Sequence, residues 1–465
     1  MNLFAGLSDF GAHTAVIADD GQRLSYKELA SHADEAARPL HGTRKLLAID
    51  CDNSVASLCA YLGAVRARHA VLLLDPALPD ALRQVLLARY AIEAAWTAKS
   101  RSWQWLRSVP APLMLHGDLA ILLSTSGTTG SPKLVRLSHK NLAANAASIA
   151  SYLCISQDER PVTALPMHYS YGLSVIHSHL FVGATLLLTS ESIASRSFWD
   201  FCGGEAATSF SGVPTMYEML RKLRFEQMQL PSLRTLTQAG GRLAPESIQY
   251  FAGLAQRRGW RFFVMYGQTE ASPRMAYLPP ERALDKSGSI GRPIPGGSFE
   301  IINSAGQPVT TPFIEGELVY RGANVMMGYA ERPEDLALGD VSGGALATGD
   351  LAYLDEEGFC YVTGRKKRFI KVFGNRISLD DVESFAKTIG AQAAATGKDD
   401  LLMLAVRNPA RPPAEIAVDI CRQYRLHPSA VRVVEVPEFP LSSAGKIRYP
   451  ELLESLLSPT SGTAP

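Results

Sequence analysis

Cysteine is scarce and scattered in this sequence. The 465 residues include six cysteines, and none of them forms a C-x-x-C pair or another spacing typical of metal ligands. Scattered thiols are typical of reduced intracellular proteins, whereas a disulfide scaffold needs a dense cysteine framework. The sequence therefore gives no support for a zinc site or a disulfide framework, and it predicts a cytoplasmic protein with free thiols.

An excess of charge of one sign is absent as well. Lys and Arg number 46 against 45 Asp and Glu, which leaves a net charge of +1. Nucleic acids and anionic membranes are bound by basic surfaces, so neither is a predicted partner. Uncharged apolar runs of membrane-spanning length and a secretory signal are also lacking. Any anionic ligand must therefore be bound by local groups.

The sequence does contain the alternation of strands and helices that is typical of α/β proteins. Segments of helical length, such as residues 140–149, separate short apolar runs that predict buried parallel strands at 45–50, 70–75, 119–125, 183–189 and 261–267. From about residue 287, frequent Gly and Pro with short alternating strands predict an antiparallel β subdomain. A smaller α+β domain is predicted to begin near residue 365.

The stretch STSGTTGSPK, residues 124–133, follows one of these predicted strands. Gly127 and Gly130 permit a close backbone approach, and Lys133 adds a positive charge. The loop also has hydroxyl groups that can donate to phosphate oxygens, those of Ser124, Thr125, Ser126, Thr128 and Thr129. The composition predicts a phosphate-binding loop. Its G-x-x-G-x-x-K spacing differs from that of a P-loop and so disfavours a Walker-type NTPase.

Five further motifs follow this loop in order. They read YGQTE (266–270), GELVYRGANVMMGY (316–329), TGD (348–350), GRKKRFIK (364–371) and SSAGKI (442–447). Together with the loop they resemble the signature motifs of the adenylate-forming superfamily, which includes acyl-CoA synthetases, adenylation domains of peptide synthetases and luciferases. The resemblance covers nearly the whole chain.

The resemblance implies a fold with a large N-terminal AMP-binding domain at 1–366 and a small, mobile α+β domain at 367–457. The large domain is expected to consist of doubly wound α/β subdomains with a small β-barrel-like subdomain at about 287–364. The final residues, 458–465, are small and polar and are expected to be disordered.

The resemblance also implies the catalytic roles of particular residues. Lys446 matches the lysine that bridges the acid and the α-phosphate, and Thr269 matches an α-phosphate contact. Glu270 matches the Mg²⁺ ligand, and Lys367 occupies the hinge position. The nucleotide-binding residues implied in the same way are Thr125, Ser126, Gly127, Thr128, Thr129, Gly130, Lys133, Gly240, Gly241, Arg242, Tyr266, Gly267, Gln268, Asp350 and Arg365.

Within that set, Tyr266 matches the ring that stacks on adenine, and Asp350 matches the carboxylate that binds the ribose hydroxyls with help from Arg365. Outside its motif, Asp350 would be interpreted as an ordinary turn residue. For Lys366 and Arg368 the plainer interpretation is kept, namely a solvated charged face.

The acid substrate is indicated by the segment LPMHYSYGLSVIHSHLFVG, residues 165–183. Peptide-synthetase adenylation domains place an Asp there to bind the ammonium of an α-amino acid, and this segment contains no Asp or Glu. The acid is therefore expected not to be an α-amino acid. The gating histidine of related ligases aligns with Tyr169, while His168 lies one position earlier, so both are candidates for the gate.

Three residues are candidates for the wall of the acid pocket: Tyr171, Val175 and Met265. The last precedes Tyr266, at a position that resembles a glycine of long-chain and many aryl ligases of the family and a bulky aromatic of members that act on very short acids. An intermediate Met predicts a short to medium acyl chain or a single-ring aryl acid. His177 and His179 have no acidic or cysteine neighbour in sequence and are predicted to be packing residues.

The function implied is that of an ATP- and Mg²⁺-dependent acid–thiol ligase that forms an acyl-adenylate and then a thioester. The thiol is expected to belong to CoA, with the phosphopantetheine of an acyl carrier protein as the alternative. Two rival hypotheses are an enzyme that transfers the γ-phosphoryl group and releases ADP, and a nucleotide-binding relative without activity.

The first testable prediction concerns the hinge. Lys367→Pro fixes φ at a residue that is expected to adopt two backbone conformations, so it should trap one arrangement of the domains. Acid-dependent exchange of pyrophosphate into ATP should persist, whereas thioester formation should fail. Thioester formation at the parent rate would remove Lys367 from the hinge role.

Overall fold

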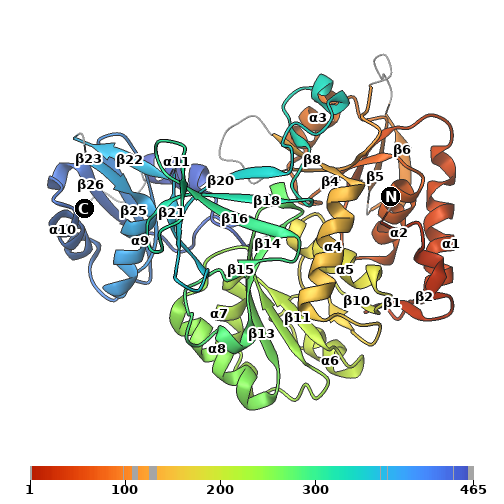
Figure 1. The fold of residues 1–465 in the computed structure, drawn as a ribbon, viewed down its shortest axis with the longest axis horizontal. Coiled ribbons are helices and arrows are strands. Elements are labelled where there is room, and N and C mark those ends of the chain that lie inside the picture. The colour runs from red at the N-terminus through yellow and green to blue at the C-terminus, as the bar shows by residue number, and fades with distance from the viewer. Residues whose placement is uncertain are drawn as a thin grey trace, which may run out of the picture.

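The computed structural model describes residues 3–97, 99–106, 114–124, 133–366, 368–373, 375–442 and 445–458. Figure 1 shows two large sheets with helices in the N-terminal part, a smaller β subdomain beside them, and a C-terminal α+β part at the opposite end from the N-terminus. The α/β class predicted from the sequence is confirmed.

The first large sheet has seven strands in the order β19-β8-β7-β4-β3-β5-β6. Its strands β3, β4 and β7 are mutually parallel, as the apolar runs predict, and β5, which no run predicted, is parallel to β3. Their bounds are β3 Leu46–Asp50, β4 Ala70–Leu74, β5 Ala94–Thr97, β6 Ser102–Trp105, β7 Leu119–Ser124, β8 Leu134–Ser138 and β19 Gly328–Ala330.

The second large sheet has nine strands in the order β15-β14-β13-β12-β11-β9-β10-β1-β2. Its centre is parallel, and β14 returns antiparallel to β13. The strands are β1 Thr14–Ala18, β2 Arg23–Ser25, β9 Pro161–Val162, β10 Leu186–Leu188, β11 Ser209–Gly212, β12 Thr235–Gln238, β13 Arg261–Gly267, β14 Arg274–Leu278 and β15 Arg292–Pro293.

Helices cover both faces of each large sheet. One core cluster joins the inner faces of the two sheets through α1 Tyr26–Ala37, α2 Val55–Arg66, α4 His139–Leu153 and α5 Ser170–Phe181. The outer face of the nine-stranded sheet packs on α6 Arg196–Gly204, α7 Pro214–Lys222 and α8 Pro245–Arg258, and that of the seven-stranded sheet packs on α3 Asp80–Arg89.

Alternation along the strands explains these layers. Leu47 and Ile49 of β3 belong to the inner cluster, whereas Leu46 and Ala48 belong to the outer one, because successive side chains of a strand point to opposite faces. A strand buried on both faces is therefore apolar throughout. The doubly wound arrangement predicted for the N-terminal domain is confirmed.

A five-stranded antiparallel sheet forms the predicted β subdomain. Its order is β17-β16-β18-β20-β21, so it is open, with β17 and β21 as edges, rather than closed into a barrel. The strands are β16 Gly297–Ile302, β17 Pro308–Val309, β18 Gly316–Gly322, β20 Ala345–Leu354 and β21 Cys360–Arg365.

The C-terminal part has a hydrophobic core of its own, in agreement with the predicted α+β domain. It contains β22 Phe369–Val372, β23 Asn375–Ser378, α9 Leu379–Thr388, β24 Gln392–Lys398, β25 Leu401–Arg407, α10 Pro413–Tyr424, β26 Val431–Glu435 and α11 Tyr449–Leu457. Lys367, the predicted hinge, and residues 459–465 of the predicted tail lie outside the described residues.

The solvated face predicted for Arg368 is wrong. Its side chain is only 16% exposed, and its guanidinium pairs with Asp380 and donates to both oxygens of Glu383 at 2.5 and 3.2 Å. The ring of Tyr449 covers the same guanidinium at 3.9 Å. Lys366 is 57% exposed, as predicted, and its ammonium lies 2.7 Å from Glu317.

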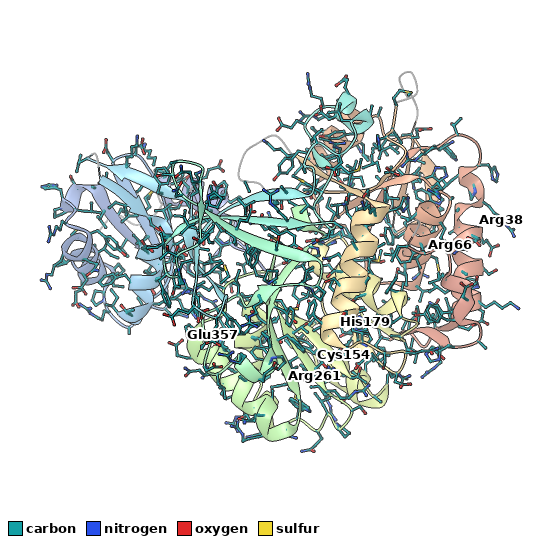
Figure 2. All side chains as sticks on the ribbon, in the orientation of Figure 1. Arg38, Arg66, Cys154, His179, Arg261 and Glu357 are labelled. Carbon is teal, nitrogen blue, oxygen red and sulfur yellow. The ribbon has the colours of Figure 1, made fainter. Side chains whose placement is uncertain are left out.

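The cysteines are free, as predicted, and four of the six are buried. Cys154 is exposed directly after α4 and lies near Arg261 at the start of β13 (Figure 2). The Arg261 guanidinium donates to the Leu153 carbonyl at 2.9 Å.

Among the described residues, no helix is both long and apolar enough to cross a membrane.

Close packing of α1 on α2 leads to the second prediction. A Cβ at Gly63 in α2 would lie 2.0 Å from the Ala33 carbonyl oxygen, whereas a Cβ at Gly253 in α8 would meet only a side-chain atom of Arg257 at 3.5 Å. Gly63→Ala should destabilise the protein by about 1–3 kcal/mol through overpacking. Gly253→Ala should be neutral or stabilise it by up to about 1 kcal/mol through helix propensity.

Thermal melting of the two variants beside the parent protein checks this difference. Equal melting temperatures for Gly63→Ala and Gly253→Ala would contradict the packing argument.

Candidate functional site

A cavity at the junction of the N- and C-terminal parts collects residues that lie far apart in the sequence. Its lining includes Tyr169, Ser170, Gly240, Thr269, Arg274 and Lys446. They come from the start of α5, the segment after β12, the segment after β13, the start of β14 and the loop before α11. The carboxyl ends of parallel strands β12 and β13 thus form one side, where ligands of open α/β sheets usually bind.

Lys446 reaches this cavity from the C-terminal part. Its ammonium lies 5.4 Å from the centre of the Tyr169 ring. A Cβ at the preceding Gly445 would lie 3.0 Å from Oγ1 of Thr215, so the loop lies close against the start of α7. Burial lowers the pKa of Lys446, Arg365 lowers it further, and Glu270 raises it.

Asp350 forms the centre of a hydrogen-bond network beside the cavity. It is 2% exposed, and its carboxylate accepts from the hydroxyl of Tyr266, from Nε2 of Gln268 at 3.1 Å and from Nε of Arg365 at 3.0 Å. Arg365 lies directly opposite Asp350 in the β20–β21 ladder. Burial and the neighbouring Asp350 raise the pKa of Tyr266. The structure thus brings together the three residues that the motifs assign to adenine and ribose.

Glu270 directly follows the cavity-lining Thr269, in a short 3₁₀ turn at Thr269–Ala271. The hydroxyl of Tyr329 donates to its Oε1 at 2.7 Å, and burial together with Glu270 raises the pKa of Tyr329. The Lys133 ammonium lies 5.6 Å from the Tyr329 ring and 2.7 Å from Glu331. Lys133 therefore lies close to the predicted Mg²⁺ ligand, although more than a hundred residues separate them.

The two gate candidates point to different places. His168 faces Asp75, with Nε2 3.5 Å from its carboxylate, and its Nδ1 lies 3.4 Å from the Cys51 carbonyl. Burial lowers the pKa of His168, and Asp75 opposes this shift. Tyr169 instead lines the cavity beside Lys446, and only Tyr169 of the pair does so.

The other predicted nucleotide-binding residues are placed as follows. Gly240 lines the cavity and adopts a φ of +87°, Gly241 and Arg242 follow it, and Gly267 and Gln268 line the cavity beside Thr269. Thr125, Ser126, Gly127, Thr128, Thr129 and Gly130 lie outside the described residues.

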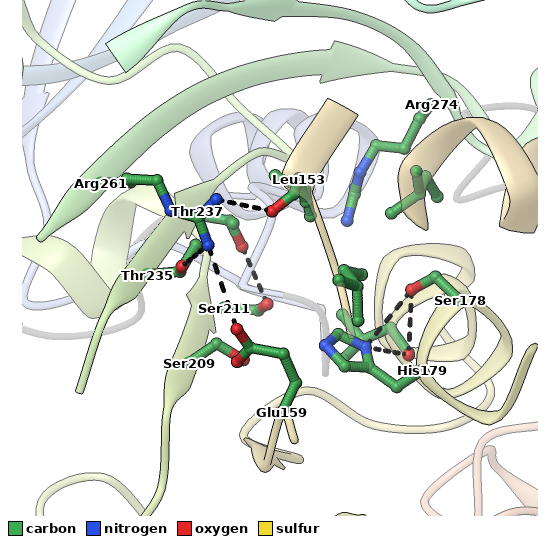
Figure 3. A pocket seen from close by; sticks show the side chains of 13 residues that line it. Leu153, Glu159, Ser178, His179, Ser209, Ser211, Thr235, Thr237, Arg261 and Arg274 are labelled. Carbon is green, nitrogen blue, oxygen red and sulfur yellow. Dashed lines mark hydrogen bonds and ion pairs between the residues drawn. The ribbon is translucent and has the colours of Figure 1, made fainter. Parts of the chain in front are cut away.

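A second, deeper cavity lies between α4, α5 and strands β11 to β13 (Figure 3). Val175 and Arg274 line it, and Tyr171 closes it toward the first cavity with its hydroxyl 2.9 Å from the Thr237 carbonyl oxygen. Met265 lines neither cavity: its sulfur accepts from the Tyr152 hydroxyl at 3.0 Å within the core.

The two histidines of α5 pack as predicted. His177 bonds the Tyr61 hydroxyl at 2.7 Å, and burial lowers its pKa to about 3. His179 bonds the Val175 carbonyl at 2.8 Å through Nδ1, and burial lowers its pKa to about 4. It also lines the deeper cavity, which the sequence did not indicate.

Two residues near the first cavity, Tyr329 and Arg274, were not predicted from the sequence. Tyr329 is the last residue of the motif GELVYRGANVMMGY, whose resemblance assigns no role to it. Arg274 begins the short strand RMAYL, where a strand-forming pattern gives no sign of a cavity.

Comparisons with known proteins show the family of this chain. A family model described as AMP-binding enzyme matches residues 5–101 and 83–330, so the chain belongs to the AMP-binding enzyme family. A medium-chain acyl-CoA ligase from Mus musculus is 30% identical over 71% of this chain and 56% of its own length. A 2-succinylbenzoate–CoA ligase from Bacillus velezensis is 34% identical over 63% of this chain and 58% of its own length.

Among solved structures, O-succinylbenzoate coenzyme A synthetase from Bacillus subtilis in complex with AMP superposes with a TM-score of 0.81 and 25% identity. That alignment covers 100% of this chain and 99% of the other. The chain spans little more than half of the length of the two curated relatives.

Gly240 generates the third prediction. A Cβ there would lie 2.4 Å from the Tyr169 hydroxyl, and a positive φ is costly for any residue with a Cβ. Gly240→Ala should therefore weaken AMP binding by roughly tenfold, since about 1–2 kcal/mol of strain falls on the site. Isothermal titration with AMP measures this loss.

Gly253→Ala is the control, because Gly253 lines neither cavity, its Cβ would meet only a side-chain atom of Arg257 at 3.5 Å, and no positive φ is involved. An AMP affinity of Gly240→Ala equal to that of Gly253→Ala would show that Gly240 does not shape the site.

Proposed function

We propose that this protein is an ATP-dependent ligase that joins a carboxylic acid to a thiol through an acyl-adenylate. The observation that carries the proposal is the position of Lys446: a lysine of the C-terminal part lines the same cavity as Thr269, Gly240 and Arg274. The family and the named activities of its relatives support the same chemistry.

The first step joins two anions, the acid and ATP. A carboxylate oxygen forms a bond to the α-phosphorus, and the bond from that phosphorus to the leaving oxygen breaks, releasing pyrophosphate. Both partners are negative, so positioning and neutralisation dominate the rate. Lys446 and Thr269 line one cavity, which supports a role for both at this reacting centre, and the hydroxyl of Ser170 lies 3.0 Å from that of Thr269.

The nucleotide is bound beside Lys446. Tyr266 supplies an aromatic ring for adenine. Asp350 supplies a carboxylate that accepts hydrogen bonds from the ribose hydroxyls, and Gln268 and Arg365 donate to the same carboxylate. Lys133 and residues 125–130, assigned by their motif, bind the phosphates.

Glu270 fits a Mg²⁺ ligand. Its carboxylate supplies oxygen ligands for a cation and lies near Lys133, the lysine proposed to bind phosphate. The described residues contain no group of three or more side chains that could hold a metal ion by themselves. Mg²⁺ is commonly held by one or two carboxylates together with substrate phosphates. When bound, the ion neutralises charge on the phosphates. Tyr329 orients the carboxylate through its hydrogen bond.

The second step needs space for a thiol. The thiol sulfur attacks the acyl carbon, the bond to the AMP oxygen breaks, and AMP leaves. Lys446 occupies the entrance next to Tyr169, so the C-terminal part must move away, with Lys367 as the proposed pivot. Tyr169 is the proposed gate, since His168 turns away toward Asp75.

CoA is the proposed acceptor, supported by relatives that are named CoA ligases. The phosphopantetheine of an acyl carrier protein is the alternative. Acid-dependent exchange of labelled pyrophosphate into ATP tests the first step, and product analysis with free CoA tests the second. Formation of ADP in place of AMP and pyrophosphate would overturn the proposal.

The fourth prediction concerns Lys446 itself. Lys446→Ala should lower acid-dependent pyrophosphate exchange by roughly two to three orders of magnitude, the scale for removing one preorganised charge. Thioester formation from a supplied acyl-adenylate should be largely retained, because Lys446 has then left the site. Lys387→Ala, an exposed lysine at the end of α9, is the control and should keep both half-reactions. Equal loss of both half-reactions in Lys446→Ala would contradict the two-arrangement scheme.

A further inference from the structure

Arg274 is a buried cation with unused hydrogen-bonding capacity. It is 2% exposed, and among the described residues neither its Nε nor its Nη1 has a hydrogen-bond partner. Burying a charged group without partners is costly. An arginine in this situation indicates that something outside the described protein groups completes its contacts.

The position of Arg274 is fixed by its backbone. Its carbonyl oxygen accepts from Nδ2 of Asn145 at 3.0 Å and from Nδ2 of Asn324 at 2.8 Å, which ties the start of β14 to α4 and to the segment after β18. The ring of Tyr171 covers one face of the guanidinium at 3.8 Å. The guanidinium is therefore preorganised, with its N–H edge left for a ligand.

That guanidinium lies where the two cavities meet. Arg274 and no other residue appears in both linings, and in Figure 3 its side chain points from β14 into the deeper cavity. Tyr169 and Tyr171 lie between Lys446 and Arg274, with their ring centres 6.2 Å apart. A ligand that enters past Lys446 reaches Arg274 beyond these two rings.

The deeper cavity is polar on one side. Ser209 and Ser211 of β11 lie beside Thr235 and Thr237 of the neighbouring strand β12 on one wall, with the hydroxyls of Ser211 and Thr237 2.8 Å apart. Glu159 is the one acidic residue in this lining, and it is already within 4.0 Å of Arg234 and Arg261. A tunnel for a long alkyl chain would instead be apolar on all sides.

We propose that the acid activated by this protein carries a second carboxylate, which Arg274 binds at the inner end of the acid site. This inference rests on the proposed function, since it names the substrate class of that same site. Two cations then serve the two ends of one ligand: Lys446 meets the carboxylate that reacts, and Arg274 meets the one that does not. Two N–H groups of a guanidinium can donate in parallel, as a fork, to the two oxygens of one carboxylate.

The fifth prediction compares matched acids in acid-dependent pyrophosphate exchange with ATP and Mg²⁺. The pairs are succinate with butyrate, glutarate with pentanoate, and isophthalate with benzoate. The parent protein should favour at least one diacid over its monoacid by about tenfold or more in kcat/KM. Arg274→Met should lower that preference by roughly 10- to 100-fold, the loss expected when hydrogen bonds to a charged group are removed.

Two further variants separate recognition from folding. Arg274→Lys should retain part of the preference, because lysine keeps the charge and loses the fork. Arg261→Met is the matched control: Arg261 also lines the deeper cavity, but its guanidinium already donates to the Leu153 carbonyl at 2.9 Å and to the Thr235 hydroxyl at 2.8 Å. The diacid preference should survive that substitution.

The outcomes are distinguishable. A parent protein that activates monoacids as well as diacids would overturn the inference and leave the proposed function standing. Equal losses for both acids of a pair in Arg274→Met would mean that Arg274 contacts the reacting carboxylate, which also overturns it. Failure of every acid to support exchange, with ADP as product, would overturn the proposed function.

Discussion

The burial of α5 between the two large sheets is the constraint on which the site depends. All but the last of its residues are buried, so the helix touches both sheets through one layer of side chains. Gly172 allows this: a Cβ there would lie 2.4 Å from the Pro166 carbonyl oxygen. The first turn of the helix therefore sets the directions of Tyr169 and Tyr171 beside the first cavity, and the second turn places Val175 beside the deeper one.

The parts of the fold that could be predicted are those governed by local pattern. Apolar runs such as residues 70–75 became central parallel strands, because a strand covered on both faces must be apolar along its length. The ordered motifs predicted the grouping of Tyr266 with Asp350 and Arg365, and the β20–β21 register accounts for part of it.

The parts that could not be predicted depend on contacts between distant segments. Arg274 takes its place from Asn145, 129 residues earlier, and Tyr329 meets Glu270 across 59 residues. Whether His168 or Tyr169 faces the cavity depends on where α5 starts and on the position of Asp75. The motif sequence alone does not specify either. Arg368 was misassigned for the same reason: a run of four basic residues does not show that Asp380 and Glu383 will cover one of them.

The anchoring of the chain on either side of residue 367 has a mechanical consequence. Arg365 is held to Asp350, and the backbone N–H of Lys366 donates to the Gly349 carbonyl at 2.8 Å, so both belong to the N-terminal body. Arg368 is clamped in the C-terminal body by Glu383 and Tyr449. The pivot proposed at Lys367 would then act between two firmly held neighbours. Rotation about such a pivot would follow a narrow arc, unlike the broad range of orientations that a flexible linker allows.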